Sequence, residues 1–273
     1  MKLYDFDAKF YDYVRTWMAI HPGIKEDEVE QKYNEMMLSW LNAPAQWLGG
    51  EKPGEYFNRY SDPRDLIKLL EEYLKRDMGL PEPLYSRIVA LGEACAPALA
   101  RIAADEDKPE ALRGTAIAML RDMDSSLPRD LYIDLVCNAQ AYDELGEMAA
   151  DVLRDSDESV VDALLSRYDG ATEYGQMTIL DICSRFPPRD QVFERLVYKL
   201  DNSPENTGFY AALLGDYGDP RALEALMRAH GRADLEYLDY IEVRNAIEAL
   251  GGDPGEERVF NGDDAYEALR GMD

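Results

Sequence analysis

A leucine-like position that recurs about every thirty residues constrains the fold of this chain most. The position is occupied by Leu91, Leu120, Leu153, Cys183, Leu214 and Leu250, which are separated by 29, 33, 30, 31 and 36 residues. Each of these residues closes an apolar segment, and a turn rich in Gly, Asp or Pro precedes the next one. A period of this length predicts stacked helical hairpins, because one hairpin cannot bury its apolar stripe alone.

The segments between the turns have the spacing of helices. Apolar residues recur at helical intervals over roughly 10–16 residues, and no segment shows the two-residue alternation of a half-buried strand. Asp62 followed by Pro63 predicts the start of a helix. Small residues at Ala116, Ala149 and Ala246 allow neighbouring helices to approach. The sequence therefore predicts an all-α fold, a solenoid of about six antiparallel helix pairs.

The clearest repeat is residues 213–226, which read Leu-Leu-Gly-Asp-Tyr-Gly-Asp-Pro-Arg-Ala-Leu-Glu-Ala-Leu. This order of Leu-Gly, a short turn, Asp-Pro and an apolar helix resembles bacterial HEAT repeats, of the kind also found in phycobilin-lyase-like proteins. The positions similar to the family's second helix are Arg113, Ala116 and Leu120. The resemblance covers residues 62–255, with departures at Cys183 and at residues 186–188. It implies that the solenoid is a right-handed superhelix of HEAT-like hairpins. It carries over no catalytic residue, since that fold hosts many unrelated functions.

Residues 1–60 match no repeat and hold all three tryptophans of the chain. The aromatic residues that share one face of a predicted helix are Phe6, Phe10, Tyr13 and Trp17. A second helix is predicted from about Lys25 to Leu41, and its first turn carries three acids that suit the helix dipole, namely Glu26, Asp27 and Glu28. We expect residues 1–60 to cap a repeat array of residues 61–255.

The C-terminal tail, residues 256–273, is expected to cover the last hairpin. Its apolar side chains are those of Val259, Phe260, Tyr266 and Leu269.

The charge of the chain restricts its partners. It has 55 acidic and 29 basic side chains, for a net charge of −26. This surplus repels phosphate backbones and anionic lipids, which argues against nucleic-acid and membrane binding. It attracts cationic partners, although acidity also simply keeps a soluble protein dispersed.

The location predicted from the sequence is the cytoplasm. No segment approaches the ~18 apolar residues of a membrane span, and the first residues lack the apolar run of a signal peptide. Three cysteines, an odd number, lie far apart in apolar helical contexts at Cys95, Cys137 and Cys183. This arrangement favours free thiols in a reducing compartment.

The sequence shows no set of residues with the spacing of a catalytic or metal-binding site. The two histidines, His21 and His230, have no nucleophile that the sequence pairs with them. No Cys or His spacing fits zinc, no acidic cluster has the calcium-loop pattern, and no glycine loop fits phosphate. We therefore predict a protein that is not an enzyme, with no catalytic residue, metal site or cofactor.

Tyrosines near the starts or middles of predicted second helices are the candidate binding residues. They are Tyr142, Tyr174, Tyr237 and Tyr240, and HEAT-like arrays tend to line their concave face with those helices. Tyrosine together with acid suits a basic peptide or protein. Arg113 and Arg244, inside second helices, are candidates for anion recognition there. The alternatives are that the tyrosines fill the core and that the arginines pair with aspartates of neighbouring turns.

The leading functional hypothesis is an intracellular scaffold or adaptor with an acidic, tyrosine-containing concave surface that binds a basic protein or peptide. An alternative is an inhibitor or immunity-type protein that blocks a basic enzyme by acidic mimicry of nucleic acid. A third possibility is an enzyme acting on a nucleobase or tetrapyrrole in the concave face. A version that acts on DNA needs a basic groove, which the acidity argues against. The oligomeric state is left open by the sequence.

Overall fold

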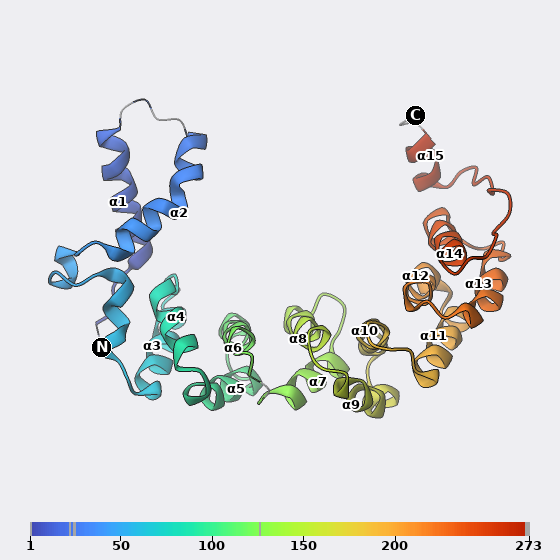
Figure 1. Cartoon of the computed structure of the whole chain (residues 1–273), viewed down its shortest axis with the longest axis horizontal. Coiled ribbons are helices and arrows are strands. Elements are labelled where there is room, and N and C mark those ends of the chain that lie inside the picture. Colours follow the sequence, from blue (N-terminus) through green and yellow to red (C-terminus); the bar gives the residue numbers. More distant parts are fainter. Residues whose placement is uncertain (1, 22, 24–25, 126, 271–273) are drawn as a thin grey trace. The chain divides into compact units, whose positions relative to one another are not determined.

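The computed structural model describes residues 2–21, 23, 26–125 and 127–270 (Figure 1). The side chains of Glu26, Asp27, Glu28 and Leu269, for which the sequence predicted roles, lie outside the described part, as does Lys25. Within it, the regular elements are fifteen α-helices and six short 3-10 helices, and a single isolated bridge joins Ala45 to Glu51. The all-α prediction is confirmed. The chain forms two compact units, residues 1–131 and 132–273.

Unit 1 begins with a helical hairpin and continues with two more. The first hairpin is α1 (Phe6–Ile20) and α2 (Glu26–Asn42), followed by the 3-10 helices η1 (Gln46–Leu48) and η2 (Pro53–Arg59). The next two hairpins are α3 (Pro63–Lys75) with α4 (Glu82–Leu91) and α5 (Ala96–Ala104) with α6 (Glu110–Asp122), and η3 (Gly92–Ala94) joins them. Asp62 caps α3 as predicted, because its side chain accepts a hydrogen bond from the Arg64 backbone N–H.

The N-terminal aromatic residues form a cluster that packs on α3. The Phe6 ring lies 5.3 Å from that of Trp47 and 5.4 Å from that of Phe57, measured between ring centroids. The Tyr73 hydroxyl, on α3, donates a 2.9 Å hydrogen bond to the Tyr4 carbonyl oxygen. Phe6 and Phe10 are buried, as their helical spacing predicts. Residues before α3 thus share a core with the first repeat-like hairpin.

Unit 2 has two layers of helices. One layer holds α7 (Arg129–Asn138), α9 (Ser159–Arg167), α11 (Asp190–Asn202) and α13 (Leu223–His230). The other holds α8 (Glu144–Arg154), α10 (Glu173–Ser184), α12 (Thr207–Tyr217) and α14 (Tyr237–Ala249), which lie side by side in chain order (Figure 1). The connections contain η4 (Tyr168–Gly170), η5 (Pro204–Asn206) and η6 (Pro220–Ala222), and α15 (Asp264–Arg270) ends the described chain.

The recurring leucine-like positions mark the ends of the second helices. Each lies within the last four residues of α4, α6, α8, α10 or α12, or just after α14. In the clearest repeat, α12 continues through Gly215 to Tyr217. The turn residue that follows is Gly218, whose left-handed φ of 74° suits glycine.

Candidate functional site

Ion pairs between successive hairpins engage many of the arginines of unit 2. Arg154 on α8 lies 2.7 Å from Asp181 on α10, and their side chains are only 19% and 17% exposed. Pairs of the same kind in the other layer are Arg167–Asp134, Arg189–Asp162, Arg221–Asp190 and Arg228–Asp201. The paired residues are 27 to 33 positions apart, close to the repeat period. These contacts therefore join each hairpin to the next.

Helices α8, α10, α12 and α14 each have a side that faces away from the other helix layer, and carboxylates without an ion pair remain there. We call this side of the four helices the acidic face. Helices α10 and α12 have neighbours on both flanks and are backed by the other layer, so their exposed residues share one side (Figure 1). The exposed acids of the four helices include Glu144, Glu173, Asp216 and Glu242. Within the described residues, none of these four forms an ion pair.

Apolar side chains accompany these acids. Phe209 on α12 and Leu238 on α14 are exposed, the latter by 59%. Tyr142 lies in the turn just before α8 and is 97% exposed, with a backbone φ of 68°. Such a φ is uncommon for a residue other than glycine. Exposed apolar groups therefore occur on α12 and α14 and in the turn before α8, on the same elements as these carboxylates or next to them.

Tyr174 lies on the acidic face and is half-buried in the first turn of α10. Its hydroxyl donates a 2.5 Å hydrogen bond to Glu147 on α8. This bond, with a smaller effect of burial, raises the pKa of Tyr174 to about 12. The hydroxyl is therefore engaged between two helices, and the residue as a whole is half-buried.

Tyr240 is fully buried, so its prediction as a surface anchor is wrong. Its ring stacks on His230 with centroids 4.9 Å apart, and its hydroxyl accepts a 2.9 Å hydrogen bond from the Arg258 backbone N–H. Tyr237 is half-buried against Phe260, at a centroid distance of 5.5 Å. The chain after α14 folds back over both tyrosines. The alternative stated above, that the candidate tyrosines belong to the core, therefore holds for Tyr240.

Arg113 and Arg244, the two arginines predicted as binding residues, form hydrogen bonds within their own units. In unit 1, the Arg113 Nε donates a 2.9 Å hydrogen bond to the Ala103 carbonyl oxygen, near the end of α5. In unit 2, the Arg244 Nη1 donates a 3.0 Å hydrogen bond to the Gly255 carbonyl oxygen. Carbonyl oxygens, rather than the expected aspartates of neighbouring turns, receive these bonds. Arg113 lies in a different unit from the five other predicted binding residues.

The groups capable of chemistry are dispersed. Among the described residues, no group of three or more His, Cys, Asp or Glu could hold a metal ion. The three cysteines are free and buried, and burial raises the pKa of the Cys183 thiol to about 12. Burial, with smaller effects of Arg258 and Arg244, lowers the pKa of His230.

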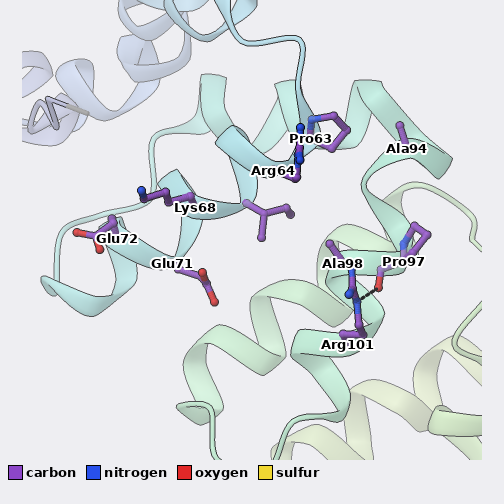
Figure 2. A pocket seen from close by; sticks show the side chains of 10 residues that line it. Pro63, Arg64, Lys68, Glu71, Glu72, Ala94, Pro97, Ala98 and Arg101 are labelled. Carbon is purple, nitrogen blue, oxygen red and sulfur yellow. Dashed lines mark hydrogen bonds between the residues drawn. The ribbon is translucent and has the colours of Figure 1, made fainter.

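Unit 1 contains a groove that the sequence did not reveal. It lies between α3 and α5, has a volume of about 540 Å³, and is lined by both charged and apolar side chains (Figure 2). Its cationic residues are Arg64, Lys68 and Arg101, and its apolar ones include Pro63, Ile67 and Pro97. The one sequence feature that accompanies this groove is the spacing of Arg64 and Lys68, two cations one turn apart on α3. Many exposed helices have cations at the same spacing.

No family model, curated protein or solved structure matches this chain. In the part of the chain that the structure describes, no helix has the length and apolar character needed to cross a membrane.

Proposed function

We propose that this protein is a cytoplasmic scaffold whose acidic face binds a basic protein or peptide. The observation that carries the proposal is the distribution of charge in unit 2. Many of its arginines are engaged in pairs between hairpins, whereas Glu144, Glu173, Asp216 and Glu242 are exposed and form no ion pair with described residues. The repeated hairpins support a HEAT-like superhelix that turns α8, α10, α12 and α14 inward.

Binding at this face would combine charge and apolar area. The carboxylates steer a cationic partner and fix its register, but exposed charge pairs add little affinity by themselves. Desolvation of aromatic and aliphatic anchors contributes more, and Tyr142, Phe209 and Leu238 provide such anchors. The proposed interaction needs no cofactor and weakens as ionic strength rises.

The proposal is tested by fluorescence anisotropy with a labelled Lys/Arg-rich peptide that has a central leucine. The variant carries Glu144→Gln, Glu173→Gln, Asp216→Asn and Glu242→Gln. A control removes the same charge from exposed acids of unit 1 through Glu30→Gln, Glu35→Gln, Glu93→Gln and Glu106→Gln. We expect the first variant to bind about tenfold more weakly and the control to change affinity by less than about twofold at 0.15 M salt.

Two results would contradict this function. Equal losses in both variants would mean that the peptide responds only to net charge. The absence of saturable binding by the unmodified protein would remove the acidic face as a binding site.

A further inference from the structure

The groove between α3 and α5 has a positive charge that its own acids do not cancel. Glu71 is bound by Lys108, 2.7 Å away, and Glu72 by Arg76, 3.2 Å away; neither cation lines this groove. Lys68 and Arg101 line it and form no ion pair with any described residue. The acids of the groove are therefore neutralised from outside, and two cations are left over.

Arg64, the third cation, is already engaged. Its guanidinium lies 2.6 Å from Asp62, the residue that caps α3. The recognition of an anion would thus rest on Lys68 on α3 and Arg101 on α5, one cation on each of the two helices that line the groove (Figure 2). Arg101 is anchored by a 3.1 Å hydrogen bond from its Nε to the Pro97 carbonyl oxygen, which leaves its two terminal nitrogens for a ligand.

A groove in unit 2 shows that this charge is not a consequence of hairpin packing. It lies between α11 and α13 and also has a volume of about 540 Å³. Its cations are neutralised by its own lining, because Arg228 lies 2.9 Å from Asp201 and Arg232 lies 2.9 Å from Asp234. Similar helix packing thus gives one neutralised groove and one cationic groove in a chain whose net charge is −26.

A second, separate hollow of about 190 Å³ lies next to the cationic groove. The two hollows share Lys68 and Glu72, and the second is also lined by Leu3, Leu69 and Arg76. The cationic groove itself has an apolar part, formed by Pro63, Ile67 and Pro97, which suits a side chain rather than a phosphate.

We propose that this groove binds an acidic peptide segment whose carboxylates contact Lys68 and Arg101 and whose apolar side chain packs on Ile67 and Pro97. This site prefers the opposite charge from the acidic face and does not depend on the function proposed above. If both sites operate, the chain connects a basic partner to an acidic one, as a scaffold does.

The test uses the full chain and a labelled peptide of Asp and Glu residues around a central leucine, with anisotropy read at 0.15 M salt. Lys68→Glu with Arg101→Glu should weaken binding by about tenfold or more, because two attractive contacts become repulsive. Arg15→Glu with Lys32→Glu gives the same change in net charge on exposed residues of α1 and α2, away from the groove, and should change affinity by less than about twofold.

Further outcomes decide between this site and its alternatives. A peptide with serine in place of the leucine should bind more weakly. Displacement of the labelled acidic peptide by low concentrations of citrate would indicate a small-anion site and overturn the proposal. Equal losses in the groove and control variants, or no saturable binding, would also overturn it. The Lys/Arg-rich peptide should bind the groove variant at least as tightly as the unmodified protein, which separates this test from that of the acidic face.

Discussion

Gly215 on α12 lies directly against Ala246 on α14. A Cβ atom at Gly215 would lie 3.0 Å from the Ala246 Cα and 3.1 Å from its Cβ, closer than ordinary van der Waals contact. Gly208, two turns earlier, meets Asp239 in the same way, at 2.5 Å from Oδ1. Small residues on both helices allow this approach, which joins two neighbouring helices of the acidic face.

Replacing Gly215 should therefore destabilise unit 2. Gly215→Leu would force side-chain atoms into the α14 backbone, and we expect a loss of about 2–3 kcal/mol in the free energy of unfolding. Urea unfolding followed by circular dichroism measures it. Gly170→Ala is the control, because a Cβ there meets nothing within 4 Å. An unchanged midpoint for Gly215→Leu would show that the two helices do not pack this closely.

The ion pair between Arg154 and Asp181 should matter more than the exposed pairs. Both side chains are less than one-fifth exposed, so Asp181→Ala leaves a half-buried guanidinium with weaker partners, at a cost of about 1–2 kcal/mol. Asp162→Ala, which removes a partner of Arg189 that is 78% exposed, should lower the free energy of unfolding much less. Equal costs in urea unfolding would mean that burial does not distinguish these pairs.

His230 should make the stability of unit 2 depend on pH. Its pKa is lowered in the folded protein, so the unfolded chain binds the proton more readily. The stabilising contribution is complete above a pH of about 6.5, the ordinary pKa of histidine, and is lost as pH falls toward the folded pKa.

His230→Phe removes this titration while keeping an aromatic ring against Tyr240. The melting temperature of this variant should fall less between pH 7 and pH 5.5 than that of the unmodified protein. Parallel curves for the two proteins would contradict the role assigned to His230.

The cysteines should resist thiol reagents while the protein is folded. Cys95, Cys137 and Cys183 are all buried, and burial raises the pKa of each thiol. Little reactive thiolate is then present at neutral pH. Labelling by a disulfide reagent should be slow in buffer and rapid for all three thiols in urea, and fast labelling of a native thiol would contradict the described burial.

Most of the secondary structure could be predicted from neighbouring residues. The start of α3 at Pro63 follows from the capping carboxylate of Asp62, and the burial of Phe6 and Phe10 follows from their spacing along one helix. Caps and apolar periodicity act within a few turns, so the sequence displays them directly.

The candidate sites were less predictable. Tyr174 lies at the start of a second helix, as the sequence predicts. The sequence also predicts a surface position for Tyr240, which is buried, because nothing near it in sequence shows that the chain after α14 covers it. The net charge predicts an acidic surface but not which residues form it. Which acids stay without an ion pair depends on which arginines and aspartates the fold brings into contact.

The sequence by itself determined that the chain is helical, repetitive and strongly acidic, because these properties depend on composition and local periodicity. Only the tertiary structure decided where charge remains uncompensated. Lys68 and Arg101 stand 33 positions apart, and Glu71 is neutralised by Lys108 from a later loop. Folding creates that groove because ion pairing and burial depend on distances in space, which the order of residues does not display.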